Sequence, residues 1–588
     1  MGNKKKFFGF NEDYWGHKWG FKDSSFIVDS DKNVIFTGDR YDICGKKLPK
    51  LIPFIEEITE MDFQVIPELK EVEKKPIEPP KINKDFLNEL KILFNKDQYT
   101  TNDNERLLHS HGQTSSDEVY KVLYSKLDKC VDMVFYVESE DELIKLVELS
   151  KKYNICLIPY GGGTSVSSAL KIPIKEKRTI ISIDTRRLDK ILSVDNENLL
   201  VTVESGITGL KLEKELEKIG FTVGHEPDSI EFSTVGGWIS TNAAGMKKNK
   251  YGNIEDIVRN ITMITPNGIL NQIQPLTRSS LGIQPQNLIF GTEGNLGLIT
   301  KATLKIHHLP ENISFESIVF PNWDIGLKFM KELVHSSSSL PASTRLMDNL
   351  QLKLGNTLKE EKKGFDKQLD RFKKYLLFNV KGLDPDKIVG GVFKIEGTKE
   401  ETEYQRKILN KLAKKYKGIM AGGNQGKSGY NVTAVVAYLR ELIFAQNIIG
   451  ETLETTVPWS KINNVKNALK EAVIALNQSY NLPGKPFFCS RISKIYHNGV
   501  CMYSTLAIPF RGIEDPEIIF SDIEHKLRSV IMKNGGSISH HHGVGKSRMD
   551  YMEQTLSDGN IKLLKSIKSS SDPNNIFGIR NNIFYNKD

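Results

Sequence analysis

Three adjacent histidines, His540, His541 and His542, are the residues of this chain best suited to proton transfer. Lys546 follows them, and no acidic residue intervenes before Asp550. Such a segment can exchange protons near neutral pH and hold a phosphate dianion. The local pattern indicates an extended segment, with His541 on the face opposite the other two. A solvated basic strand is the alternative. We expect no metal here, because no His-Glu-x-x-His helix or acidic partner set lies nearby.

Glycine-rich clusters are the second chemical feature. Residues 159–165 read Pro-Tyr-Gly-Gly-Gly-Thr-Ser after a predicted buried strand, so several backbone N–H groups can converge on one anion. Residues 228–237 and 291–297 have a similar character, and residues 241–245 between them are small and polar. Three spaced clusters predict a site for one large dinucleotide. The glycine run alone would indicate an ordinary turn, since the G-x-G-x-x-G fingerprint is absent.

Two further side chains are ambiguous from the sequence alone. Tyr503 lies in a predicted half-buried strand and would by itself be assigned to the core. Arg440 lies in an apolar stretch, where a buried guanidinium needs a partner: a substrate phosphate, Glu441 or a more distant acid, unless the side chain reaches solvent. Residues 421–428 resemble a phosphate-binding loop, but alanine replaces its first glycine, so we expect an ordinary loop.

Regular elements that could position these residues are visible from residue 131 onward. We predict a strand over 131–137, a helix capped by Ser139, and a strand over 155–159 leading into the glycine run. Strands over 179–183 and 199–204 and a helix over 210–219, closed by Gly220, follow. The charged stretch 353–374 indicates a solvated helix or a mobile insertion.

Composition sets wider limits. A chain of 588 residues is too long for one ordinary core. The 81 basic and 73 acidic residues give a net charge of +8, which indicates no nucleic-acid partner. Five scattered cysteines without a Cys-x-x-Cys pair favour a reducing compartment and neither disulfides nor a thiolate zinc site. No stretch has the length and apolar character of a membrane span. Neither end shows a targeting signal.

The order of these motifs resembles the vanillyl-alcohol-oxidase type of FAD-binding enzymes. Within that family it is most similar to the branch that makes ether lipids, over nearly the whole chain. The resemblance implies an α+β fold with an FAD-binding domain of that type over 125–310 and an α+β cap or substrate domain over 311–520. A helical N-terminal part covers 1–124 and contains a linker near 71–82. A helical C-terminal part covers 521–588. The closing part carries the His-rich segment. The residues expected to bind FAD noncovalently are Pro159, Tyr160, Gly161, Gly162, Gly163, Thr164, Ser165, Asp228, Ser229, Ile230, Glu231, Phe232, Ser233, Thr234, Thr241, Asn242, Ala243, Ala244, Glu293, Gly294, Asn295, Leu296, Gly297, Leu298 and Ile299.

The resemblance also implies a reaction. The acyl chain of acyl-dihydroxyacetone phosphate is exchanged for a long-chain fatty alcohol, through a flavin N5 adduct and without net redox change. Tyr503 is the implied acid/base, with positive charge from the histidines favouring its phenolate. The other implied catalytic residues are His225, His540, His541 and His542, and the implied substrate-binding residues are Arg345, Arg440 and Lys546.

Two other readings stay open. One is an FAD-dependent oxidoreductase of a 2-hydroxy acid or phenolic alcohol, and the other is a flavin-free interaction protein with the same scaffold. The family further implies a peroxisomal homodimer with a peripheral membrane contact.

Overall fold

The computed structural model describes residue 14 and residues 17–63, 76–273, 277–278, 280, 282–361 and 364–585. The basic start of the chain, the first half of the expected linker near 71–82 and the last three residues lie outside these ranges. Residues 76–83 run without helix or strand into α2 (Lys84–Leu93). Among the described residues, no helix combines the length and the apolar character needed to cross a bilayer.

The glycine run begins at the end of a four-stranded sheet, in which three strands are parallel and one edge strand is antiparallel. Its order is β4 (Tyr99–Thr100), β5 (Met133–Tyr136), β7 (Ile180–Asp184) and β6 (Cys156–Tyr160). Parallel strands require a crossover connection, which α5 (Glu140–Tyr153) provides between β5 and β6. The predicted cap is confirmed, because Ser139 Oγ accepts the N–H of Glu142 at 3.3 Å.

A five-stranded antiparallel sheet forms the rest of the predicted FAD-binding domain. Its order is β12 (Gly268–Leu270), β11 (Val258–Thr265), β13 (Leu298–Lys305), β9 (Leu200–Glu204) and β8 (Ile191–Asp195). Three helices pack into its core: α6 (Gly209–Glu217), α7 (Val235–Ser240) and α9 (Ile254–Ile257). The short helix α8 (Lys248–Tyr251) precedes α9 in the chain and contributes no residue to this core. The helix α6 ends at Glu217 with Lys218 as its C-cap, two residues before the glycine predicted to cap it. Gly220 follows in a turn with a φ of +83°, a backbone conformation that glycine adopts with little strain.

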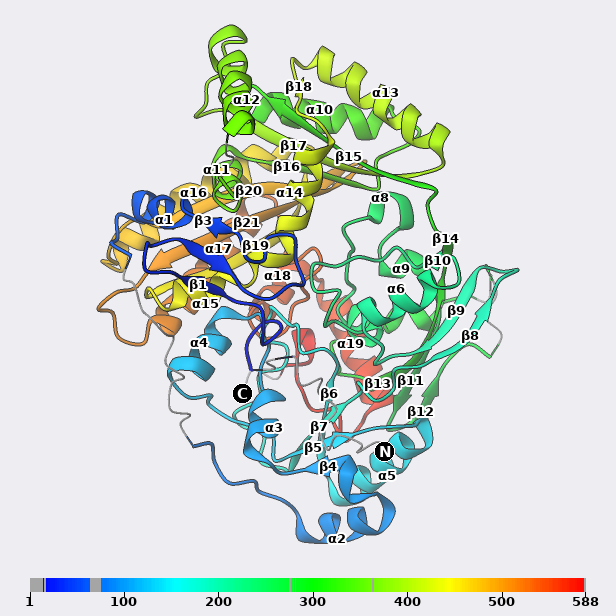
Figure 1. Cartoon of the computed structure of the whole chain (residues 1–588). Coiled ribbons are helices and arrows are strands. Elements are labelled where there is room, and N and C mark those ends of the chain that lie inside the picture. The colour runs from blue at the N-terminus through cyan, green and yellow to red at the C-terminus, as the bar shows by residue number, and fades with distance from the viewer. Residues whose placement is uncertain are drawn as a thin grey trace, which may run out of the picture.

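A seven-stranded antiparallel sheet faces these two sheets across the molecule (Figure 1). Its order is β18 (Ile419–Met420), β15 (Asn312–Phe320), β17 (Val389–Gly397), β16 (Ser343–Met347), β20 (Phe487–Tyr496), β21 (Gly499–Pro509) and β19 (Ile448–Pro458). One face packs against α10 (Trp323–Ser336), α13 (Lys399–Lys415), α16 (Ile462–Ser479) and α17 (Pro516–Lys533). Side chains alternate along a strand, so Met502 enters that core while Tyr503 faces the opposite way.

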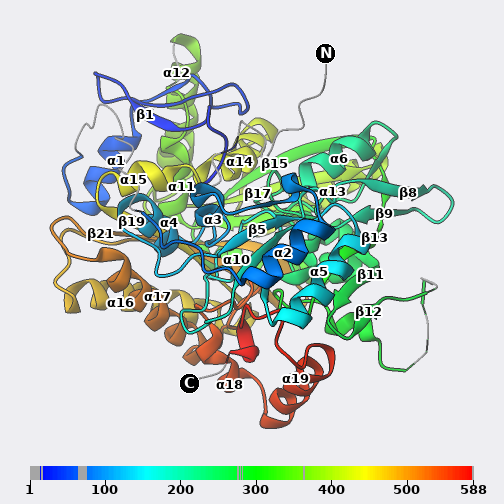
Figure 2. The same cartoon turned by 90° about the horizontal axis from the view of Figure 1, so that it is seen from below.

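Both ends of the described chain pack against other parts of the molecule. A three-stranded sheet of β1 (Phe26–Val28), β2 (Val34–Phe36) and β3 (Lys47–Leu48), followed by α1 (Leu51–Thr59), shares a core with α14 (Gly423–Val436) and α15 (Leu439–Phe444). The N-terminal part therefore carries a small sheet beside its helices. After α19 (Asp558–Ser571) the chain returns to β6, where Ile576 O accepts the N–H of Leu157 at 2.7 Å (Figure 2).

Two elements cross the predicted domain limits. The helix α17 extends past residue 520, and its buried face lies in the core of the seven-stranded sheet. The strand β4 lies before residue 125, yet it pairs with β5. The stretch 353–374 contains the end of α11 (Asn349–Thr357) and most of α12 (Gly364–Tyr375), a solvated helix that projects from the molecule in both views (Figures 1 and 2).

Candidate active site

A cavity of about 1070 Å³ lies between the two predicted FAD-binding sheets and the seven-stranded sheet. The glycine clusters line one side of it, and β16, β20, β21 and β19 line the other. One end is apolar, with Leu352, Leu358, Leu377, Phe378 and Ile388 among its lining residues. The cavity therefore joins a polar, glycine-rich region to a region suited to a hydrocarbon chain.

The glycine run 161–163 lies against neighbouring backbone so closely that side chains are excluded. A Cβ at Gly162 would lie 2.1 Å from the carbonyl oxygen of Phe232, and one at Gly161 would lie 2.6 Å from Thr234 Oγ1. Gly163 has a φ of +71°, which strains other residues. The run thus exposes bare backbone to the cavity, as a cradle for a pyrophosphate requires.

Most residues predicted to bind FAD line this cavity. They are Pro159, Tyr160, Gly161, Gly162, Gly163, Thr164, Ser165, Asp228, Ser229, Ser233, Thr234, Thr241, Ala243, Ala244, Glu293, Gly294, Gly297, Leu298 and Ile299. Six others lie outside its lining: Ile230, Glu231, Phe232, Asn242, Asn295 and Leu296. Phe232, for example, stacks on Tyr14, and Glu231 accepts a hydrogen bond from Tyr41.

Glu293 connects the glycine clusters to the loop that follows the histidines. Its carboxylate accepts the N–H groups of Val544 and Gly545 at 2.8 and 3.0 Å and the amide of Asn582 at 3.0 Å. Burial raises the pKa of Glu293, while these hydrogen bonds act in the opposite direction. The His-rich loop is thereby fixed to the predicted cofactor wall.

Tyr503 is one of the residues that line the cavity. Its hydroxyl donates to Thr452 Oγ1 at 3.0 Å, and its ring lies 5.6 Å from that of His542 and 6.1 Å from that of His541, between centroids. Burial raises the pKa of Tyr503 well above its ordinary value, and the nearby Arg491 guanidinium lowers it. The carbon of that guanidinium lies 4.1 Å from the centre of the tyrosine ring.

The histidine segment is bent rather than extended, so the predicted division of its side chains between two faces is wrong. The His540 and His541 rings are 5.0 Å apart and those of His541 and His542 are 4.6 Å apart, between centroids. The cause is Glu454, a fully buried carboxylate on β19 that accepts the N–H groups of His540 and His542. One acceptor bonded to alternate backbone amides pulls the segment into a turn.

The histidines are also neutral, which corrects the expectation that they supply positive charge. Burial lowers the pKa of His540 and of His542 to about 3, and that of His541 well below its ordinary value. Arg491 supplies the positive charge beside Tyr503 instead. The Glu454 carboxylate has the opposite behaviour: its pKa is held well below the ordinary value despite burial, because His542, His541 and Arg548 surround it.

Of the predicted substrate arginines, both Arg345 and Arg440 line the cavity. The Arg345 guanidinium lies 4.6 Å from the centre of the Tyr430 ring and contacts the sulfur of Met246. Arg440 is buried and donates to Glu441 at 2.6 Å, the acid considered from the sequence, while its Nε has no hydrogen-bond partner. The orphaned Nε is a donor available to a ligand anion.

Three residues predicted to act in catalysis or substrate binding lie outside the cavity lining: His540, His225 and Lys546. His225 is buried against Trp238, with ring centroids 4.6 Å apart, and neither ring nitrogen has a hydrogen-bond partner among the described residues. Lys546 donates to Asn581 Oδ1 at 2.7 Å and to the carbonyl oxygen of Ala169 at 3.4 Å. Burial lowers the pKa of Lys546 to about 7. The roles assigned to these three residues stay predictions.

Arg491 and Glu454 were missed from the sequence. Arg491 pairs directly with Tyr503 across β20 and β21, and a turn signal at His497-Asn498-Gly499 indicates that hairpin. A register shift between Ile492 and Lys494 displaces the pairing by one residue, which the sequence does not show. Glu454 carries no signal that connects it with a loop 86 residues away.

The site fits FAD. The close approaches at Gly161 and Gly162, which leave bare backbone along the cavity wall, suit a long polar ligand lying along backbone. Fold and site together define a flavoenzyme of the vanillyl-alcohol-oxidase type. Two family models match accordingly: the FAD binding domain over residues 131–273 and the C-terminal domain of FAD linked oxidases over residues 309–580. The chain belongs to the alkyldihydroxyacetonephosphate synthase family of FAD-dependent enzymes.

Three similar proteins establish this membership. The alkyldihydroxyacetonephosphate synthase of Caenorhabditis elegans is 39% identical over 96% of this chain and 94% of its own length. The protein of the same name from Dictyostelium discoideum is 30% identical over 86% of this chain and 82% of its own. A solved alkyldihydroxyacetonephosphate synthase structure has a TM-score of 0.83 at 27% identity, covering 98% of this chain and 99% of that one. The expected fold class and cofactor are confirmed.

Proposed function

We propose that this enzyme makes ether lipids by replacing the acyl chain of acyl-dihydroxyacetone phosphate with a long-chain fatty alcohol, releasing a fatty acid. The observation that carries the proposal is one cavity whose lining combines the glycine cradle, Tyr503 and three arginines with the apolar side chains of Leu352, Leu358, Leu377, Phe378 and Ile388. The names of the relatives support the same reaction.

The arginines are suited to the substrate phosphate. Arg345, Arg440 and Arg491 all line the cavity, and guanidinium groups bind phosphate through charge-assisted hydrogen bonds. Among them, Arg440 and Arg491 each retain a buried Nε without a hydrogen-bond partner. With the phosphate held there, the acyl chain, and later the alkyl chain, lies along the apolar residues near Leu377 and Phe378.

Tyr503 is the group that exchanges a proton with C1 of the substrate. Its phenolate accepts the C1 proton, and the neutral imidazoles of His541 and His542 beside its ring can receive and return protons. Bound FAD would supply N5 as an electron acceptor toward C1, and the residues of the cavity would hold the substrate there while the carboxylate leaves and the alcohol, giving up its hydroxyl proton, takes its place. The proton then returns to C1, so the exchange needs no external electron acceptor.

An anaerobic visible spectrum tests this reaction. We expect acyl-dihydroxyacetone phosphate to bleach the flavin and the fatty alcohol to restore its colour, with alkyl-dihydroxyacetone phosphate formed and no electron acceptor present. Tyr503→Phe should neither bleach nor turn over, whereas Tyr404→Phe, at a half-exposed tyrosine on α13, should behave like the parent. Recovery of colour with an oxidant but not with the alcohol would instead show an oxidoreductase. A preparation that takes up no flavin would contradict both.

A peripheral membrane contact through α12 is part of the proposal. Phe365, Leu369, Phe372 and Tyr375 are exposed on this projecting helix, and Lys374 and the following Leu376 line the cavity. An apolar stripe with basic neighbours suits the surface of a bilayer, where fatty alcohols reside. Peroxisomal residence and a homodimer are inferred from the family, and co-localisation with a peroxisomal marker and light scattering of the purified enzyme test them.

A further inference from the structure

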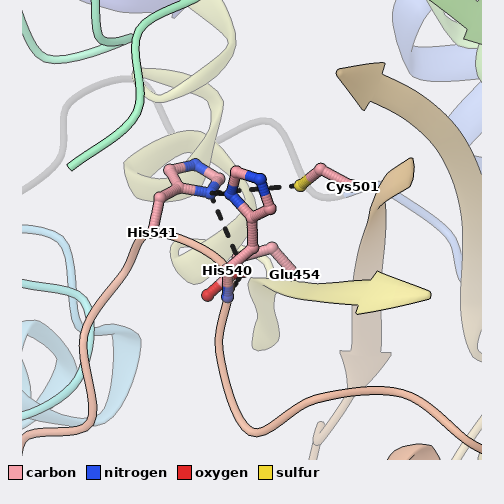
Figure 3. A group of neighbouring side chains, drawn as sticks. All are labelled: Glu454, Cys501, His540 and His541. Carbon is pink, nitrogen blue, oxygen red and sulfur yellow. Dashed lines mark hydrogen bonds and ion pairs between the residues drawn. The ribbon is translucent and has the colours of Figure 1, made fainter. Parts of the chain in front are cut away.

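Four potential metal ligands converge beside the cavity, from β19, β21 and the histidine loop (Figure 3). They are Glu454, Cys501, His540 and His541, and their ligand atoms all lie within 4.8 Å of one another. His541 Nδ1 is 3.0 Å from His540 Nδ1, 3.7 Å from Glu454 Oε2 and 4.0 Å from Cys501 Sγ. Three elements far apart in the sequence thus direct nitrogen, oxygen and sulfur atoms at one point.

These separations are close to those of a tetrahedral zinc site. Bonds of about 2.0 to 2.1 Å to nitrogen or oxygen and about 2.3 Å to sulfur imply ligand atoms roughly 3.3 to 3.6 Å apart. The three pairs that include His541 Nδ1 need adjustments of a few tenths of an ångström to reach these values, and the other pairs, all within 4.8 Å, need to close by at most roughly 1.2 to 1.5 Å. Sulfur and imidazole ligands suit Zn²⁺ and disfavour the oxygen-seeking Mg²⁺ and Ca²⁺.

The surrounding hydrogen bonds leave the required lone pairs available. His540 Nε2 lies 2.7 Å from the Tyr496 hydroxyl, a partner that directs His540 Nδ1 toward the group. Glu454 Oε1 accepts from Ser539, His542 and Arg548, whereas Oε2 accepts the N–H of His540 alone among the described hydrogen bonds and faces His541. One position on Oε2 is therefore open.

We propose that Glu454, Cys501, His540 and His541 bind one Zn²⁺ ion and that this ion inhibits the enzyme. The expectation of no metal relied on an extended segment and on the lack of an acidic partner. The bend of the loop and the approach of Glu454 remove both reasons. Binding converts the Cys501 thiol to a zinc-bound thiolate and releases one proton to solvent, with no change of oxidation state.

The inhibitory effect rests on the proposed function. His541 lines the substrate cavity beside Tyr503, and zinc would occupy its Nδ1 and place a divalent cation at the wall of the site. A histidine that holds zinc can no longer pass a proton through that nitrogen. Metal binding itself does not depend on the reaction and is measured separately.

The binding test uses the tag-free enzyme with FAD bound, freed of metal by a chelator and then dialysed against Zn²⁺ or titrated with Co²⁺ as an optical probe. We expect one equivalent of Zn²⁺ per chain. Co²⁺ should give intense bands of tetrahedral thiolate-bound cobalt at wavelengths longer than the flavin absorption. Cys501→Ser should abolish the sulfur-dependent bands and weaken zinc binding at least about 100-fold, since even second-shell partners of a metal are worth roughly 10- to 100-fold.

Cys489→Ser is the matched control, because Cys489 is equally buried on the neighbouring strand β20 and does not belong to the group. It should bind zinc like the parent. Turnover of the parent and of Cys489→Ser should fall at least tenfold with one equivalent of Zn²⁺ and recover with chelator, while Cys501→Ser keeps its activity with or without zinc.

Substoichiometric binding, or binding unaffected by Cys501→Ser, would overturn the site. Stoichiometric binding with unchanged turnover would overturn its inhibitory role. If the synthase reaction itself is not observed, the cobalt spectrum and the zinc stoichiometry still decide whether the site exists, so the two failures are distinguishable.

Discussion

At the scale of single residues, the proposed chemistry depends on the pair Tyr503 and Arg491, of which the sequence indicates only the tyrosine. Tyr503 was predicted through its resemblance to a family motif, whereas Arg491, whose guanidinium carbon lies 4.1 Å from the centre of its ring, was not. The partner was missed because a bulge shifts the strand register, a tertiary detail without a local signature. The charge assigned to the histidines was wrong for a related reason, since burial that keeps them neutral is a property of the assembled site.

Replacing Arg491 with methionine should displace the pH–rate profile to higher pH. The guanidinium lowers the pKa of the buried Tyr503, so its removal raises that pKa and reduces the phenolate fraction at any given pH. Loss of a close opposite charge shifts a pKa by about one to three units. We therefore expect kcat/KM at neutral pH to fall at least about tenfold, measured as ether product formed across a pH series.

Arg406→Met is the control, because Arg406 lies on α13 with its side chain 47% exposed and paired to Glu316. It should leave the profile unchanged. A profile of Arg491→Met that coincides with the parent's would show that this guanidinium has no influence on the catalytic proton.

At the scale of elements, local periodicity was sufficient for the strands and helices between residues 131 and 220. The predicted cap at Ser139 is present, and α6 ends at Glu217, three residues before the glycine predicted to cap it. Local pattern failed at the histidine loop, because the carboxylate of Glu454 sets its conformation from β19. The conformation of an element is predictable when its own sequence determines it, and it is not predictable when a side chain distant in the sequence determines it.

Replacing Phe365 and Phe372 on α12 with serine should weaken binding to anionic vesicles. Their side chains are 77% and 57% exposed, so their removal costs little folding stability and much membrane burial. We expect at least about a tenfold loss of vesicle affinity in sedimentation, from the apolar area no longer buried. Turnover of substrate presented in vesicles should fall in parallel.

Ile518→Ser with Leu563→Ser removes two apolar side chains of similar exposure, 58% and 60%, from α17 and α19. This control should bind vesicles like the parent. Equal losses of vesicle affinity in the two double variants would show that α12 does not form the membrane contact.

At the scale of the whole molecule, the cavity lies between two halves that are predicted from the sequence as separate domains, the FAD-binding domain and the cap or substrate domain. The limits predicted at residues 125 and 520 do not fall at gaps in the structure, because β4 pairs with β5 from the other side of the first limit and α17 extends across the second. The glycine run and Tyr503 come from opposite sides of the cavity. A cofactor bound there contacts both halves and stabilises their association.

Removal of FAD should lower the midpoint of thermal unfolding. A ligand at 100 times its Kd stabilises the native state by about 2.7 kcal/mol. The unfolding entropy of a chain of 588 residues is roughly 1.2 kcal/mol/K, so scanning calorimetry with and without FAD should show a shift of about 2 °C. Gly162→Ala should lose this dependence, because its Cβ would lie 2.1 Å from the Phe232 carbonyl oxygen. Gly559→Ala, at an open position on α19, should retain it. Equal midpoints with and without FAD would contradict a cofactor that joins the halves.

The return of the chain to β6 after α19 has a consequence for synthesis on the ribosome. Asn581 lines the cofactor cavity and donates to the carbonyl oxygens of Ala169 and Glu293, residues translated hundreds of codons earlier. This side of the nascent flavin pocket therefore stays incomplete until Asn581 has been translated. A nonsense mutation shortly before codon 581 would release a chain that contains every sheet of the fold and lacks this contact with the pocket.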